Sequence, residues 1–157
     1  MPSQSHEHWM LFALAQADLA AQHGDVPVGC VVVDEHDTLV ATGRNQRQML
    51  QDPTAHAEVQ ALRQAAQVTG HWRLNCCTLY VTLEPCPMCA GALVNARIKT
   101  LVFGCRDPKA GAVVTMMQLA CDPRLNHQCE IVEGVLSTQC AERLVSFFAQ
   151  LRAQGKK

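Results

Sequence analysis

The chain has 157 residues, a length that suits one domain with a single sizeable core. With 48% hydrophobic and 17% charged residues, and no apolar run long enough to span a membrane, the composition excludes a disordered chain and a membrane protein. The formal net charge of −1 excludes a global attraction to nucleic acid. We expect one domain over residues 1–157, located in the cytoplasm because the opening residues lack the basic region of a signal peptide.

The first half of the chain predicts a helix, a hairpin and a second helix. Apolar residues recur at helical spacing over residues 6–24, and the glycine at the end of this stretch suits a helix stop. A β-branched run at 26–34 predicts a buried strand, with residues 39–45 as its hairpin partner and a polar loop after them. The next helix is predicted over 53–68, capped by Asp52.

In the second half, strands alternate with helices. Strands are predicted at 77–83, at 100–105 and within 129–136, and a helix is predicted to begin at Pro87. Residues 111–120 are ambiguous, since Val and Thr favour a strand whereas length and Ala, Met and Leu favour a short helix. Ser137 is the expected cap of a final helix at 138–152. The order predicts a three-layer α/β/α domain with a mixed five-stranded sheet.

Cysteines are numerous, and nine of them in a chain without an export signal do not indicate a disulfide framework. Three lie in apolar runs and are expected to be buried: Cys30, Cys105 and Cys129. Scattered basic residues are expected to be solvated surface rather than a basic patch: Arg44, Arg47, Arg106, Lys109, Arg124, Arg143, Arg152 and the tail ending in Lys156 and Lys157.

Two short clusters carry metal-ligand residues, His56 in "HAE" and Cys86 and Cys89 in "PCPMC". Two thiolates, one imidazole and a free fourth position describe a catalytic zinc site rather than a closed structural one. Each half is common by itself, but together they match the zinc deaminase signature H-x-E…P-C-x-x-C, in which the Glu is an acid/base and not a ligand. The sequence therefore predicts one Zn²⁺ per subunit, with Glu58 as the catalytic residue beside it.

His56 and Glu58 are two residues apart, so within a helix their side chains leave on different sides. At the start of a helix, however, side chains tilt back beyond its N-terminus and can converge there. We expect His56 to reach the metal and Glu58 to reach the water and the substrate ring. Zinc lowers the pKa of bound water to about 7, and Glu58 would carry its proton to the ring nitrogen and then to the leaving amine.

Over nearly its whole length the chain resembles the bacterial-type tRNA adenosine deaminases, a family within the zinc-dependent cytidine/deoxycytidylate deaminase superfamily. The zinc motif alone indicates only the superfamily, and longer blocks indicate the tRNA branch. These blocks are "VPVG" at 26–29, Asn45, "DPTAHAE" at 52–58, "TLYVTLEPCPMCAGAL" at 78–93, "FGCRDPKAGA" at 103–112, "LNH" at 125–127 and "FF" at 147–148.

The resemblance implies a cytidine-deaminase-like fold, a homodimer, and a tRNA anticodon loop whose wobble adenosine is flipped into the pocket and converted to inosine by attack at C6. It implies neither a membrane nor DNA as a partner. It also implies substrate contacts: Asn45 to the base or ribose, the Ala57 backbone to the ring, Asp107 to the sugar-phosphate, Asn126 to a flanking nucleotide and Phe148 to the loop pocket. Of Phe147 and Phe148, one is expected to lie in the core.

Two features depart from the family pattern and border the expected RNA side. Cys105 stands where a small or aliphatic residue is expected, and Arg47 lies in the amide-rich loop 46–51. Both bear on substrate preference rather than on zinc chemistry.

Two other functions stay open. A small-molecule deaminase acting on guanine, cytosine or a nucleotide would share the metal and Glu58, but would need a closed pocket. A non-catalytic zinc-stabilised scaffold would need a fourth ligand such as His71 or His127, neither of which sits in a paired spacing. Glu58 argues against the scaffold, because a structural site has no use for an unligated acid.

Overall fold

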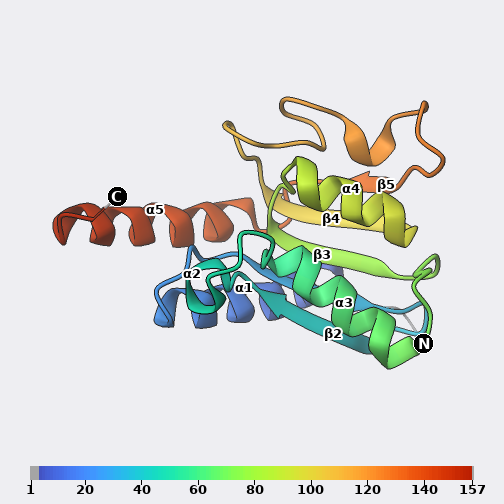
Figure 1. Ribbon diagram of the computed structural model, residues 1–157, viewed down its shortest axis with the longest axis horizontal. Coiled ribbons are helices and arrows are strands. Elements are labelled where there is room, and N and C mark those ends of the chain that lie inside the picture. The colour runs from blue at the N-terminus through green and yellow to red at the C-terminus, as the bar shows by residue number, and fades with distance from the viewer. Residues whose placement is uncertain (1–3, 157) are drawn as a thin grey trace.

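A mixed sheet of five strands, in the order β2-β1-β3-β4-β5, lies at the centre of the molecule (Figure 1). The computed structural model describes residues 4–156; residues 1–3 and Lys157, which belong to the expected domain and basic tail, lie outside that range. β1 runs antiparallel to both β2 and β3, and β3, β4 and β5 run parallel. The strands are β1 (Gly29–Val33), β2 (Leu39–Arg44), β3 (Thr78–Leu83), β4 (Thr100–Cys105) and β5 (Glu130–Val132).

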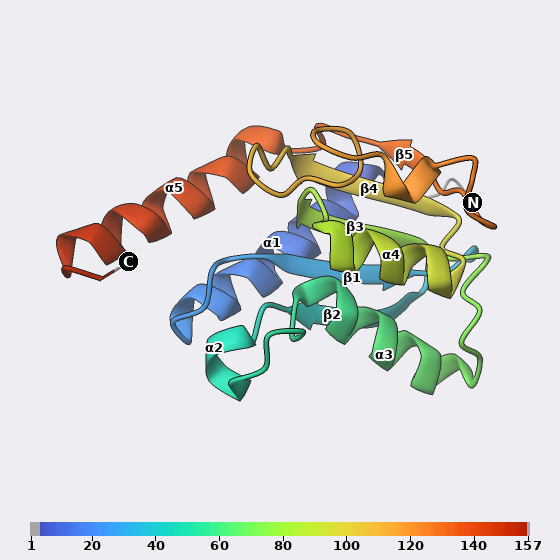
Figure 2. The same cartoon turned by 45° about the horizontal axis from the view of Figure 1, so that its top comes forward.

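Helices cover both faces of this sheet, which confirms the predicted three-layer α/β/α architecture (Figure 2). On one face α1 (His6–Gln22) packs against β1 and β3, and the start of α5 (Ser137–Ala153) packs against β4. The opposite face carries α3 (Ala57–Thr69) and α4 (Pro87–Ala96), which also contact each other. The sheet therefore holds α3 and α4 side by side.

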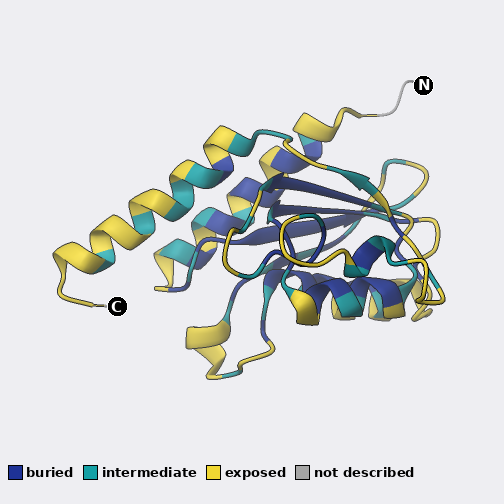
Figure 3. Ribbon diagram, turned by 90° about the horizontal axis from the view of Figure 1, so that it is seen from above, coloured by how far each residue is buried: buried dark blue, intermediate teal, exposed yellow. Residues whose placement is uncertain are grey.

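Side chains alternate along each strand, so the sheet contributes to two hydrophobic cores, one on each of its faces. In β1, Cys30 and Val32 point to the layer with α3 and α4, whereas Val31 and Val33 point to the layer with α1. Because both faces are covered, β1 is buried throughout and shows no polar alternation (Figure 3). β1 is therefore an interior strand of the sheet, paired on one side with β2 and on the other with β3.

Gly43 of β2 sets how closely α3 approaches the sheet. A Cβ at this position would collide with the Ala57 carbonyl oxygen, the backbone at the very start of α3. Glycine therefore allows the N-terminus of α3 to lie directly on the strand.

The start of the second helix was predicted wrongly. α3 begins at Ala57 rather than at Pro53, and its N-cap is His56. The Asp52 carboxylate instead accepts hydrogen bonds from the Thr54 amide at 2.8 Å and the Thr54 hydroxyl at 2.7 Å. Asp52 thus closes a turn ahead of the helix, which is the competing use of a residue that also favours N-caps.

Other boundaries differ in smaller ways. The loop after β2 contains one helical turn, α2 (Arg47–Leu50). Residues 111–118 form turns that lead into the 3₁₀ turn η1 (Leu119–Cys121), and the Glu84 carboxylate accepts hydrogen bonds from the Val113 and Val114 amides in these turns. Ser137 is the first residue of α5, and Leu136, with a φ of 52°, is the N-cap.

α5 leaves the body of the protein, and most of its length is exposed (Figure 3). Cys140 is its buried residue, whereas Phe147 is half-buried and Phe148 is 41% exposed, so the expectation that one of the two phenylalanines lies in the core was wrong. Of the three cysteines expected inside, Cys30 and Cys129 are buried and Cys105 is only half-buried at the end of β4. Within residues 4–156, no helix has the length and apolarity that a membrane span requires.

Candidate active site

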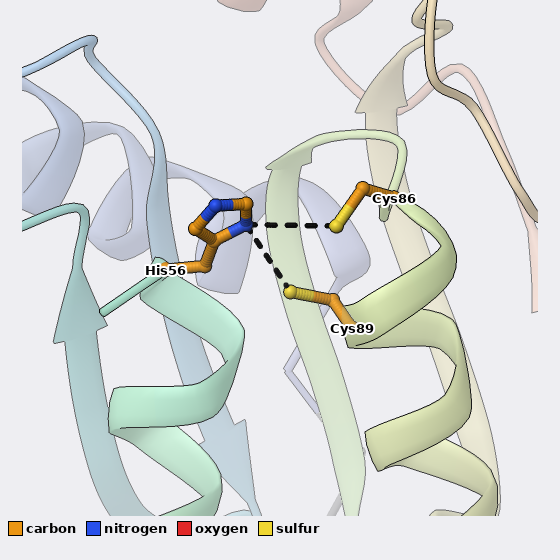
Figure 4. Close-up of side chains that lie close together, drawn as sticks. All are labelled: His56, Cys86 and Cys89. Atoms are coloured by element: carbon orange, nitrogen blue, oxygen red, sulfur yellow. Dashed lines mark hydrogen bonds between the residues drawn. The ribbon is translucent and has the colours of Figure 1, made fainter. Parts of the chain in front are cut away.

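Three side chains of metal-ligand type meet between the starts of α3 and α4 (Figure 4). His56 is the N-cap residue of α3, Cys86 is the N-cap of α4, and Cys89 lies within the first turn of α4. The Nδ1 atom of His56 is 3.6 Å from the Sγ of Cys86 and 3.5 Å from the Sγ of Cys89. The three ligand atoms all lie within 4.8 Å of one another.

Local sequence explains why α4 begins where it does. β3 ends at Leu83, and Pro87 occupies the first turn of the helix, where its missing amide costs no hydrogen bond. The carbonyl of Cys86 accepts the first helical bond from the Ala90 amide at 2.8 Å. Both ligand clusters therefore stand at helix N-termini, whose partial positive charge favours thiolates there.

The donor set fits zinc. Bonds of about 2.3 Å to sulfur and about 2.0–2.1 Å to nitrogen, at tetrahedral angles, separate the nitrogen and sulfur ligands by about 3.5 Å. The Nδ1–Sγ distances of 3.5 and 3.6 Å agree with this geometry. Among residues 4–156 no fourth side chain joins this group, so the fourth tetrahedral position is left to a ligand from outside it.

The protonation of the three groups is mutually dependent. Hydrogen bonds with Cys89 and with His56 lower the pKa of the Cys86 thiol to about 4. The hydrogen bond with Cys86, together with burial, raises the pKa of Cys89, and the hydrogen bond with Cys86 raises the pKa of His56. Without a metal, Cys86 is therefore a thiolate that accepts hydrogen bonds from protonated Cys89 and His56. A divalent cation that replaces these protons would bind all three groups.

Glu58, the second residue of α3, is 4% exposed and lies in the same cavity as His56. Burial raises the pKa of its carboxyl to about 7, although bonding to its own backbone amide and the nearby His56 oppose the rise. A carboxyl with such a pKa holds and releases a proton at neutral pH, which is the property of a general acid/base.

A cavity of about 230 Å³ opens over this cluster. This volume is below the roughly 300–1,000 Å³ of pockets for drug-sized ligands, and suits one planar ring system. Six of the nine residues predicted for the site line it: Asn45, His56, Ala57, Glu58, Cys86 and Asp107. The remaining lining residues are Val26, Val28, Arg47, Leu83, Glu84 and Ala110.

The other three predicted residues lie elsewhere. Cys89 is fully buried behind the cavity wall, from where its sulfur still reaches His56. Asn126 is exposed in the segment before β5. Phe148 lines a separate groove of about 800 Å³ between α1, α2 and α5. Val26 and Arg47 line both this groove and the cavity, so the two hollows adjoin.

Hydrogen bonds fix the side of the cavity formed by the loop after β2. Asn45 accepts a bond from the Arg47 amide at 3.1 Å and donates to the Val26 carbonyl at 3.2 Å. Asp25, which is 1% exposed, accepts bonds from the Gln48 and Met49 amides at 2.6 and 3.2 Å. A buried carboxylate thus caps α2 and holds this rim in place.

Sequence reasoning missed Asp25 and Glu84, and it treated Arg47 as solvated surface within a loop that departs from the family pattern. The sequence does carry one indication of Glu84, because it is a charged residue between an apolar strand and the first metal-ligand cysteine. Its position directly between a buried strand and the metal-ligand cysteines favours burial, and a buried carboxylate needs several donors. No such signal marks Asp25.

Comparison with known proteins identifies the family of the chain. The family model of MafB19-like deaminases matches residues 4–152. The tRNA-specific adenosine deaminase of Bacillus subtilis is 45% identical over 150 residues, which cover 96% of this chain and 92% of that protein. The chain belongs to the family of tRNA-specific adenosine deaminases.

Two solved structures place this family member among related enzymes. A structure from a study of A-to-I editing by tRNA:A34 deaminases has a TM-score of 0.84 at 39% identity, and covers 87% of this chain and 99% of that one. The guanine deaminase of Bacillus subtilis has a TM-score of 0.63 at 38% identity, and covers 66% of each chain. The fold is therefore common to both kinds of deaminase.

The cluster geometry predicts that replacing Cys89 with serine removes the metal. Purified wild-type protein should hold about one zinc per chain, and Cys89→Ser much less, because a hydroxyl is a poor zinc ligand in place of a thiolate. Elemental analysis by mass spectrometry gives the ratio. Cys76→Ser is the control, since Cys76 is exposed and outside the cluster. Full zinc content in Cys89→Ser would contradict the assignment.

Proposed function

We propose that the protein deaminates adenosine to inosine at the wobble position of a tRNA anticodon. One observation carries the proposal: a cavity over His56, Cys86 and the buried Glu58, in a chain that matches tRNA-specific adenosine deaminases over nearly its full length. The guanine deaminase also shares the fold, so the fold alone leaves the substrate open.

In this proposal His56, Cys86 and Cys89 hold one Zn²⁺ in each subunit. When bound, zinc supplies a hydroxide nucleophile at neutral pH, because it lowers the pKa of water to about 7. Glu58 would accept one proton from the attacking water and deliver it to the adenine ring nitrogen. It would then accept the second proton of the same oxygen, which becomes the C6 carbonyl of inosine, and deliver it to the amine that leaves as ammonia. Burial suits Glu58 to this task, since a carboxyl with a pKa near 7 both accepts and gives up a proton.

The cavity would hold the adenine after it leaves the base stack. Asn45 and the Ala57 backbone line it and would bind the base or its ribose, while Asp107 at its rim would contact the sugar-phosphate. The volume of about 230 Å³ leaves neighbouring nucleotides outside. We therefore assign Asn126 and Phe148, which lie outside the cavity, to flanking nucleotides of the anticodon loop.

The RNA would be held by shape and local contacts rather than by overall charge. Three arginines are engaged in ion pairs: Arg106 with Glu133, Arg124 with Asp122, and Arg143 with Asp18. Arg47 lines both the cavity and the adjoining groove, where Lys156 also lies, so these two residues are placed to meet phosphates.

We further propose a single domain over residues 1–157, acting in the cytoplasm as a homodimer. Apolar side chains that a partner would cover are exposed on α4 at Met88 and, between β4 and β5, at Met116, Met117 and Leu125. Sedimentation equilibrium should give twice the chain mass of 17.2 kDa. A monomer at micromolar concentration would contradict the dimer.

The substrate assignment predicts inosine at one position of one or a few tRNAs. Unmodified tRNA should gain inosine at the first anticodon position when incubated with the zinc-loaded protein, as read by sequencing, where inosine pairs as guanosine. Free guanine and cytosine should release no ammonia. Ammonia from either base, with no inosine in tRNA, would contradict the proposal and favour a small-molecule deaminase.

The role of Glu58 predicts a variant that keeps zinc and loses turnover. Glu58→Gln should hold as much zinc as wild type, since Glu58 is not a ligand, and should lose deamination by at least about 10²-fold because an amide transfers no proton. Zinc content and inosine formation measured on one preparation separate the two effects. Loss of zinc from folded Glu58→Gln, or retained activity, would contradict the assignment.

A further inference from the structure

Glu84 is a buried carboxylate that the reaction does not use. It lies between β3 and α4 and is 2% exposed. Its carboxylate accepts hydrogen bonds from four backbone amides and one hydroxyl, all in the loop 107–115 that forms one wall of the cavity. One side chain thus binds both ends of a loop.

The bonds are distributed over both carboxylate oxygens. Oε1 accepts the Asp107 amide at 3.1 Å and the Thr115 hydroxyl. Oε2 accepts the amides of Val113, Val114 and Thr115 at 3.1, 2.9 and 3.0 Å. A carboxylate has about four lone-pair sites, so these donors saturate it. Glu84 is therefore unsuited to proton transfer, although it lies in the cavity wall.

Gly111 shows that the loop is built around this carboxylate. A Cβ at Gly111 would collide with the Glu84 carboxyl carbon and with both of its oxygens. Gly111 itself donates to the Asp107 carbonyl at 3.0 Å and accepts from the Met116 amide at 2.9 Å. The loop thus closes over the carboxylate, with glycine where any side chain would displace it.

The loop contributes Asp107 and Ala110 to the cavity. The Asp107 side chain accepts the amides of Lys109 and Ala110 at 3.0 and 3.2 Å, so both residues move with one local turn. The Glu84 bond to the Asp107 amide is where this turn is joined to the buried frame of the protein.

We propose that Glu84 is a positioning residue, which holds the loop 107–115 so that Asp107 and Ala110 form the substrate wall of the cavity. The proposal rests on the proposed deaminase function. Glutamine keeps the shape of the side chain but replaces one accepting oxygen with an NH₂ group, which would face backbone amides that also donate. Glu84→Gln should therefore release the loop without leaving a cavity in the core.

The kinetic test separates positioning from a merely structural role. Glu84→Gln should raise KM for tRNA by about tenfold, leave kcat within about twofold, and keep full zinc content, since the loop 107–115 binds substrate but supplies neither Glu58 nor a metal ligand. A role in folding alone would instead lower the apparent kcat through loss of active protein, with KM unchanged. An unchanged KM overturns the proposal.

Two further variants make the test specific. In an Asp107→Ala background, Glu84→Gln should raise KM much less, because both changes remove the contact of the Asp107 side chain with the substrate. Asp34→Asn is the matched control, since the Asp34 carboxylate also accepts two backbone amides but lies in the β1–β2 turn, away from the cavity. It should leave KM unchanged. Equal effects of Glu84→Gln with and without Asp107 overturn the proposal.

Thr115→Val serves if Glu84→Gln fails to fold. It removes only the hydroxyl donor and should raise KM in the same direction by about threefold. Hydrogen exchange tests the anchor without any substrate: in Glu84→Gln, or in Thr115→Val, the amides of residues 107–115 should exchange faster while those of α3 do not change. Unaltered exchange in this loop overturns the proposal. Faster exchange in the variant, together with a wild-type protein that makes no inosine, overturns the proposed function alone.

Discussion

The site depends on one constraint, the convergence of His56 Nδ1 with two cysteine sulfurs at the facing starts of two helices. Neither helix holds a complete ligand set, so the distances of 3.5 and 3.6 Å exist only while α3 and α4 keep their places on the sheet. Gly43 lets α3 lie directly on β2, and α4 follows β3 through a short connection. Fold stability and metal binding are therefore coupled at this point.

Around this centre, chemistry and binding come from different parts of the chain. The helix starts supply His56, Glu58 and Cys86, whereas two loops supply the polar rim of the cavity. A buried carboxylate holds each loop: Asp25 binds the amides at the start of α2, and Glu84 binds the loop 107–115. Functional loops carried on such fixed anchors can differ between relatives while the helix starts stay unchanged.

The sequence predicted the five strands, the three layers and the metal cluster, because alternation, β-branched runs and ligand spacing are local signals. It misplaced the start of α3, since Asp52 serves a turn as readily as a helix cap. It could not locate the anchors: Asp25 and Glu84 bind amides 23 to 31 residues away, and single-chain patterns carry no such pairing. The exposure of Phe148 also depends on where α5 leaves the sheet.

The zinc coordination that this geometry predicts consists of two cysteines, one histidine and one position left for solvent. X-ray absorption at the zinc edge of the purified protein tests it most directly. The geometry predicts two sulfur ligands at about 2.3 Å and two nitrogen or oxygen ligands at about 2.0–2.1 Å, one of them exchangeable. A shell of three or four sulfurs, which other cysteines among the nine would have to complete, or a shell without sulfur, would contradict this coordination.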